Sequence, residues 1–245
     1  MADARSVLLT AEWRHLAMLN FEVDPALVRT LVPAGTELDD YRGRTFVSLV
    51  GFMFLDTRVL GIAIPRHRDF EEVNLRFYVR RRTAEGWRRA VVFVKELVPR
   101  AAIAMTARVL YGENYLAVPM SHRITVAGEG AAAIRQVSYR WRFEGRDHEI
   151  SLAARGDARE IAVGSQEEFI TEHYWGYTRR RRGGTLEYQV EHPRWRAWTG
   201  LEAHLEGDTA HFYGERFAHC LKGPPASAFL ADGSTVSVFK GVRLQ

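Results

Sequence analysis

The residues with the richest chemistry share one face of a short segment, Phe70–Val79. The segment alternates polar and apolar residues, and in a β-strand such alternation sends the two sets to opposite faces. Its polar face comprises Glu72, Asn74, Arg76 and Tyr78. A carboxylate, an amide, a guanidinium and a phenol can together hold an anion and move a proton. We therefore predict that this face lines a polar ligand cavity; the alternative is a sheet with one solvated face.

Two further charges lie among apolar neighbours on predicted strands. Lys95 shares a face with three large apolar residues in the predicted strand 90–98, and Arg108 lies in the predicted strand 103–110. A charge in apolar surroundings is rarely buried without a partner. We expect both side chains to face the same cavity, where Glu72 could pair with Arg76 on its own face or with Arg108 across the sheet. The alternative for Lys95 is that it reaches the rim or points outward.

The remaining segments predict a sheet-rich chain with a few short helices. Asp24-Pro25 predicts one helix start, and Ser165-Gln166-Glu167-Glu168 matches a capping box whose helix would run to about Trp175. Further strands are expected over 45–60, 137–143, 148–152 and 235–240. Hairpin turns at 183–184 and 207–208 would set Arg180 opposite Glu187 and His204 opposite His211. No repeat, linker or break in composition interrupts residues 1–245, so we predict a single domain.

The composition suits a folded protein of a reducing compartment. Apolar residues make up 47% of the chain and aromatic residues 11%, which is enough for a large core. Cys220 is the only cysteine, so no internal disulfide can form, and no apolar run is long enough for a membrane helix. We expect a cytoplasmic protein of bacterial type, without a membrane partner. Its only lysines are Lys95, Lys222 and Lys240.

Neither a metal nor a nucleic acid is predicted as a partner. The cross-strand pair His204 and His211 is the one geometric candidate for a metal, but the whole face is polar and better explained as a solvated surface. The net charge of +4 is modest for 245 residues, and the arginine runs at 80–82, 88–89 and 179–182 lie at hairpin ends without a recognition motif. We expect no metal and no other cofactor.

Six blocks of the sequence carry a resemblance to a known family. They are 70–76 (Phe-Glu-Glu-Val-Asn-Leu-Arg), 91–94, 107–115, 169–177, 188–195 and 227–230. Together they resemble the conserved blocks of the YqjF-like family, also called domain of unknown function 2071, over nearly the whole chain. That family is similar in fold to acetoacetate decarboxylase. The resemblance therefore implies a mainly β chain folded as an antiparallel β-barrel of the acetoacetate decarboxylase type, which encloses a central cavity.

The same resemblance implies roles for particular residues. Glu72 would face the lumen, and Glu113 and Tyr115 would lie at its mouth, as a general base and a group that orients or protonates an oxyanion; the alternative is an ordinary β-turn. In the decarboxylase the Schiff-base lysine follows the glycine that corresponds to Gly112. Here Glu113 stands in that place, so classical decarboxylation is not expected, because an imine requires a primary amine. Lys95 could take its place only if its amine faced the cavity, and the favoured alternative is that it reaches the rim or points outward.

We therefore expect the chain to bind a small carboxylate- or carbonyl-containing molecule. As an enzyme it would be lyase-like or an acid/base catalyst. The catalytic residues would be Glu72, Glu113 and Tyr115, and the substrate would be held by Asn74, Arg76, Tyr78, Arg108 and Lys95. One alternative is a non-catalytic binding or sensor protein that uses the same pocket. A second is an arginine-rich interaction protein whose cavity is filled by side chains. A homo-oligomer remains open.

Overall fold

The computed structural model describes residues 6–105, 112, 114–180 and 183–244. Its strands are β1 (Val7–Val23), β2 (Glu37–Leu38), β3 (Thr45–Val59), β4 (Ile62–Ala63), β5 (Phe70–Thr83), β6 (Gly86–Val98), β7 (Tyr115–Ala117), β8 (Met120–Ala127), β9 (Ile134–Phe143), β10 (Arg146–Arg155), β11 (Arg159–Glu160), β12 (Trp175–Arg179), β13 (Thr185–Glu191), β14 (Arg196–Glu206), β15 (Ser227–Phe239) and β16 (Val242–Arg243). The helices are α1 (Pro25–Arg29), α3 (Gln166–Thr171), α4 (Thr209–Tyr213), α5 (Glu215–Leu221) and the 3₁₀ turn η1 (Gly130–Ala132). The prediction of a mainly β chain is confirmed.

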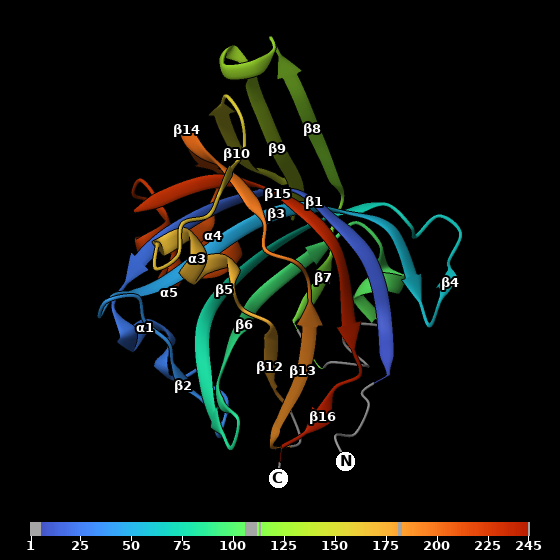
Figure 1. Cartoon of the computed structure of the whole chain (residues 1–245), viewed down its shortest axis with the longest axis vertical. Coiled ribbons are helices and arrows are strands. Elements are labelled where there is room, and N and C mark those ends of the chain that lie inside the picture. The colour runs from blue at the N-terminus through green and yellow to red at the C-terminus, as the bar shows by residue number, and fades with distance from the viewer. Residues whose placement is uncertain (1–5, 106–111, 113, 181–182, 245) are drawn as a thin grey trace.

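Seven of these strands close a circuit of hydrogen-bonded pairs. The circuit runs β13–β12–β6–β5–β3–β1–β15 and returns from β15 to β13. It corrects one expectation, because β6 pairs with β12 in parallel while the other pairs of the circuit are antiparallel. A parallel pair needs a long crossover, and the chain between β6 and β12 supplies one. Figure 1 shows β8, β9 and β10 extending away from this circuit at one end.

The two faces of the circuit contribute to separate apolar clusters. The inner face carries Phe46, Val50, Phe52 and Phe70, all buried. The outer face carries residues such as Leu49, Leu75 and Phe77, which pack with Trp141 and Ile150 of β9 and β10 and with Phe212 and Phe217 of α4 and α5. Strict alternation along β5 therefore divides its side chains between a packed outer core and the interior of the circuit.

A β-bulge in β6 interrupts this alternation. Arg76 of β5 pairs with Phe93, but its neighbour Leu75 pairs with Lys95, so Val94 is an extra residue without a partner. Residues before the bulge keep the alternation that the sequence predicts, whereas Lys95 and Glu96 exchange faces. Lys95 consequently joins the outer face with Leu75, and Glu96 joins the inner face with Asn74.

Helix starts were predicted better than helix ends. Asp24 accepts a hydrogen bond from the Ala26 amide at 2.8 Å, and Ser165 accepts one from the Glu168 amide at 3.1 Å, so both predicted caps are confirmed. However, α3 ends at Thr171 rather than near Trp175, where β12 begins. The predicted strand 103–110 is also wrong in its described part, because residues 101–105 are helical.

The two predicted hairpin turns differ in outcome. The hairpin at Gly183-Gly184 forms, but Glu187 lies opposite Tyr177 rather than Arg180. The turn at Gly207-Asp208 is wrong as a hairpin, because Asp208 instead accepts a hydrogen bond from the His211 amide and caps α4. An aspartate after a glycine suits either role, and the helix is favoured here because it buries Phe212 in the outer core.

No helix in the described part of the chain is long and apolar enough to cross a membrane.

Candidate functional site

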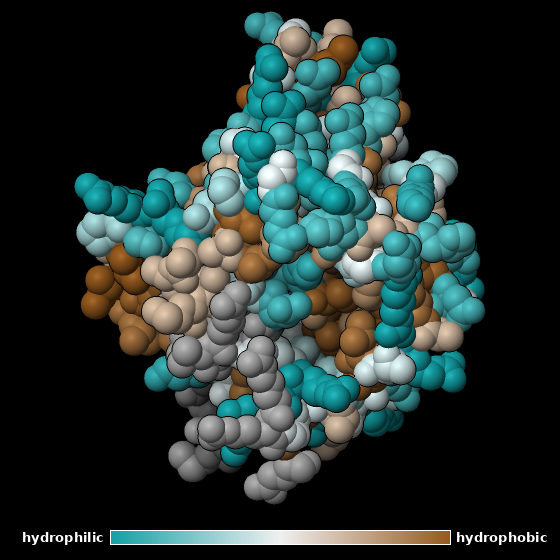
Figure 2. Space-filling view, turned by 180° about the vertical axis from the view of Figure 1, so that it is seen from behind, coloured by the Kyte–Doolittle hydropathy of each residue, from teal (hydrophilic) through white to brown (hydrophobic). Residues whose placement is uncertain are grey.

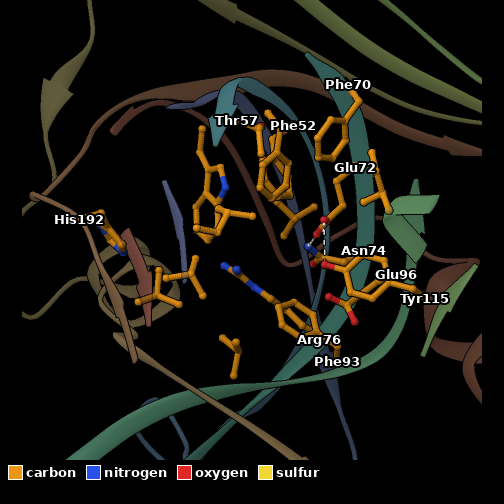
Figure 3. A pocket seen from close by; sticks show the side chains of 18 of the residues that line it. Phe52, Thr57, Phe70, Glu72, Asn74, Arg76, Phe93, Glu96, Tyr115 and His192 are labelled. Carbon is orange, nitrogen blue, oxygen red and sulfur yellow. Dashed lines mark hydrogen bonds between the residues drawn. The ribbon is translucent and has the colours of Figure 1, made fainter. Parts of the chain in front are cut away.

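A cavity of about 230 Å³ lies inside the strand circuit. Side chains of β1, β3, β5, β6, β13 and β15 form most of its wall, together with Tyr115 of β7 and residues near α3. Three of the predicted residues of β5, Glu72, Asn74 and Arg76, line it, and all three are buried. Figure 3 shows Glu72, Asn74, Glu96 and Tyr115 gathered on one side, while the Arg76 side chain extends across the pocket.

Glu72 is the centre of the polar group on that side. The Asn74 side-chain amide donates to Glu72 Oε1 at 2.9 Å, and the Tyr115 hydroxyl donates to Glu72 Oε2 at 3.1 Å. These donors fix the carboxylate in a wall that is otherwise mostly apolar. Because a carboxylate held in such surroundings can accept a proton from a bound molecule, this geometry suits a general base, and the Tyr115 hydroxyl can return a proton.

Arg76 occupies a different environment. One of its terminal nitrogens donates to the Ile170 carbonyl at 3.3 Å, and its guanidinium lies 5.8 Å from the centre of the Tyr78 ring. Its Nε has no hydrogen-bond partner, and no carboxylate among the described residues forms an ion pair with it. A buried cation without a counter-ion is unfavourable. The guanidinium is therefore ready to accept an anion from the cavity.

Glu96 is a cavity residue that the sequence did not reveal. It lines the cavity next to Asn74 and is only 1% exposed. Simple alternation places Lys95 on this face and Glu96 on the other, and the bulge at Val94 reverses both. A bulge of this type has no signature in a single sequence, so the side chain could not have been assigned from spacing.

Two predicted residues lie away from the cavity wall. Tyr78 points to the interior, but its hydroxyl contacts Ser48 Oγ at 2.6 Å, and its ring packs beneath the cavity against Phe169 and His173. Lys95 lies on the outer face, where its ammonium donates to the Phe212 carbonyl and sits over the Phe212 ring. Burial lowers the pKa of Lys95. The expectation that Lys95 faces the cavity is therefore wrong; Arg108 and Glu113 lie outside the described residues.

A buried histidine borders the cavity near α3. His173 lies just beyond the helix, and its Nε2 is 3.6 Å from Asp39 Oδ2, which also accepts a hydrogen bond from Arg89 at 2.8 Å. Burial lowers the pKa of His173 to about 4, so the ring is neutral at pH 7. Burial alone would raise the pKa of Asp39, but His173 and Arg89 hold it below its usual value.

Arginines of two of the runs considered for nucleic-acid binding, 80–82 and 88–89, have carboxylate partners within the chain. Arg81 and Arg88 both bind the buried carboxylate of Glu187, at 3.2 Å and 2.8 Å, and Arg80 binds Glu37 at 2.7 Å. The histidine pair considered for a metal does not form, since His204 lies opposite Ser151, and His211 contacts Glu144 at 2.7 Å. In the described ranges, no cluster of three histidine, cysteine or acidic side chains could hold a metal ion.

The fold defined by this circuit and cavity occurs in solved structures of acetoacetate decarboxylase-like proteins. The enduracididine biosynthesis enzyme MppR matches with a TM-score of 0.70 at 14% identity, over 97% of this chain and 90% of MppR. An acetoacetate decarboxylase-like enzyme from Sphingomonas wittichii RW1 matches with a TM-score of 0.66 at 15% identity, over 98% and 94% of the two chains. The acetoacetate decarboxylase of Legionella pneumophila matches with a TM-score of 0.63 at 14% identity, over 97% and 87%.

The family follows from sequence. Residues 10–235 match the model of the DUF2071 family, described as an uncharacterized conserved protein, and the chain belongs to this family. The uncharacterized protein YqjF of Bacillus subtilis (strain 168) is 36% identical over 73 residues, which cover 29% of this chain and 30% of YqjF. The predicted family and the acetoacetate decarboxylase-like fold are confirmed.

Proposed function

We propose that this chain binds a small carboxylate- or carbonyl-containing molecule in the cavity and holds its anionic group at Arg76. The observation that carries the proposal is the buried guanidinium, which extends into the cavity without a carboxylate partner among the described residues. A bound carboxylate would supply the missing counter-ion through charge-assisted hydrogen bonds. Further unpaired polar atoms among the cavity-lining residues, Trp13 Nε1, Thr57 Oγ1 and Asn74 Oδ1, offer hydrogen bonds to the rest of such a molecule.

Glu72 then acts as the acid/base group of this site. With the carboxylate of a keto acid at Arg76, Glu72 would take a proton from the carbon next to the carbonyl, and the Tyr115 hydroxyl would stabilise the resulting enolate oxygen. Glu113, predicted as a second base, stays a prediction. An imine route is not part of the proposal, because none of the three lysines in the sequence lines the cavity.

Binding is tested with pyruvate and acetoacetate as probes. Pyruvate is chosen because MppR has been solved in complex with it. Truncating one partner of a buried charge pair costs about 2–5 kcal/mol, so Arg76→Met is expected to weaken binding at least about 30-fold in titration calorimetry. The matched control is Arg44→Met, which removes an arginine paired with Glu22 at 2.6 Å on the surface. Equal affinities of the wild type and Arg76→Met would refute the proposal.

Catalysis is tested by proton exchange. In D₂O, the wild type is expected to exchange the methyl protons of bound pyruvate for deuterium, followed by proton NMR. Glu72→Gln keeps an acceptor for the Asn74 amide but removes the base, so exchange should fall by about 10²–10⁴-fold while binding persists. Binding without exchange above the Glu72→Gln rate would favour the alternative, a non-catalytic binding or sensor protein.

A further inference from the structure

The inner surface of the cavity is much more apolar than a short keto acid requires. Trp13 packs edge-on against Phe52 and Phe54, with ring centroids 5.3 Å and 5.7 Å apart, and Phe54 stacks on Phe70 at 4.7 Å. All four rings line the cavity. A small polar acid held at Arg76 would leave this aromatic wall in contact with water. The wall therefore matches a hydrocarbon portion of the ligand.

The mouth of the cavity is identified by which lining residues reach solvent. Among the described lining residues, Ile64 and Ala102 are exposed, whereas Glu72, Asn74 and Arg76 are buried. Ile64 follows β4, and Ala102 belongs to the helical residues 101–105. The cavity thus opens between the end of the β3–β4 hairpin and this helical turn, with its charged groups at depth.

Exposed apolar side chains lie in the β3–β4 hairpin on one side of this mouth. Leu60, Ile62 and Ile64, which we call the apolar lip, are 60%, 68% and 44% exposed. In Figure 2 a hydrophobic patch marks the edge of the molecule over the β3–β4 hairpin, on the left of that view. Three large aliphatic side chains in one exposed hairpin are unfavourable in water, and such patches commonly contact an apolar partner.

We propose that the ligand is an amphiphilic carboxylate, with its head at Arg76, its hydrocarbon body along the aromatic wall and the end of its chain on the apolar lip. This inference rests on the proposed binding of an anion at Arg76 and adds the class of molecule that carries it. The occupant is the ligand's own alkyl or acyl chain, because Ile64 belongs both to the lip and to the cavity wall, and the one unpaired cation among the described lining residues lies at depth.

The volume sets the expected dependence on chain length. A cavity of about 230 Å³ holds about eight water-sized groups at ~30 Å³ each, which corresponds to a carboxylate of medium chain length. Each methylene group buried up to that length is expected to raise the affinity about fourfold, equivalent to about 0.8 kcal/mol. Longer chains reach the half-exposed lip, where each further methylene should raise the affinity by less, roughly twofold.

The test uses linear saturated monocarboxylates from butyrate to dodecanoate, each below its micelle-forming concentration, with titration calorimetry. The lip variant Ile62→Ser/Ile64→Ser changes exposed side chains, so folding should be unaffected. It is expected to weaken decanoate binding at least about fourfold and to leave butyrate unchanged. The matched control Leu201→Ser removes an aliphatic side chain that is 55% exposed on β14, away from the mouth.

Each outcome bears on one of the two proposals. Affinity that does not rise with chain length would overturn the amphiphilic ligand but leave anion binding at Arg76 intact. If the lip variant binds decanoate as tightly as the wild type, or if Leu201→Ser weakens decanoate binding equally, the hydrocarbon chain does not leave the cavity at the lip. Octan-1-ol binding as tightly as octanoate would instead overturn the role of Arg76 and leave the hydrocarbon site supported.

Discussion

Replacing Arg76 by methionine should stabilise the protein while removing its ligand binding. Methionine has a similar length, carries no charge and adapts to irregular apolar space. Exchanging a buried charged group for an apolar one of similar size is often stabilising by about 1–4 kcal/mol. Against this, the variant loses the hydrogen bond to the Ile170 carbonyl at 3.3 Å, worth about 1 kcal/mol, and a contact with the Tyr78 ring of about 0.5–1 kcal/mol. The two losses together are about 1.5–2 kcal/mol, so the net change lies between about −1 and +2.5 kcal/mol, with an expected gain of about 1 kcal/mol.

The assay is urea unfolding at pH 7 in a buffer without carboxylates, followed by tryptophan fluorescence. For a chain of this size, a gain of about 1 kcal/mol corresponds to a rise in Tm of about 2–4 °C in a parallel thermal scan. A carboxylate at 100 times its Kd should stabilise the wild type by a further ~2.7 kcal/mol and leave Arg76→Met unchanged. Arg76→Lys, which keeps the charge, should show no gain in stability.

A loss of stability of more than about 1 kcal/mol in Arg76→Met, relative to the wild type, would contradict this expectation. That result would mean that the guanidinium is already compensated within the fold and acts as a structural residue. The burial of this cation would then no longer be evidence for an anionic ligand.

Two further predictions concern His173, which lines the cavity, and Gly233, which packs against the backbone of the lining residue Trp13. Because burial lowers the pKa of His173 to about 4, the unfolded chain binds more protons than the folded chain between pH 6.5 and 4, and stability falls with falling pH across that window. The titration of His173 alone should lower the free energy of unfolding of the wild type by about 2 kcal/mol between pH 7 and 5. In urea unfolding, the free energy of unfolding of His173→Gln should therefore fall by about 2 kcal/mol less over this range. Parallel pH dependences of the wild type and the variant would exclude this account. Gly233 has φ +75°, and a Cβ there would meet the Trp13 carbonyl oxygen, so Gly233→Ala should lose about 3 kcal/mol or more in the same assay. Gly35→Ala, with φ +81° and open space around it, should lose only about 1 kcal/mol, and equal losses would contradict the steric explanation.

Local patterns predicted a large part of this fold. Alternation along β5 put Glu72, Asn74 and Arg76 on one common face, because β5 is regular, and the resemblance to a known family turned that face to the interior. The side chains of Asp24 and Ser165 marked helix starts, since a cap is decided by a few adjacent residues. The resemblance to a known family supplied the closed arrangement, which no local pattern contains.

The failures concern contacts between distant segments. Helix α3 was expected to continue to Trp175, but pairing of Trp175 with Ala90 in β6 ends it earlier. The Asp39–His173 contact joins residues far apart in sequence, so neither position indicated it. Tertiary packing overrides local preference at these places, and a single sequence does not record that packing.

The bulge at Val94 affects how the activity of one protein of this fold can be inferred from that of another. Lys95 and Glu96 are adjacent, and the count of backbone residues in β6 decides which of them reaches the cavity. A relative with the same two residues but a regular strand would present an amine there and could form imines, whereas this chain presents a carboxylate. Identity of aligned residues is therefore a poor guide to reaction type here, and strand register must be compared first.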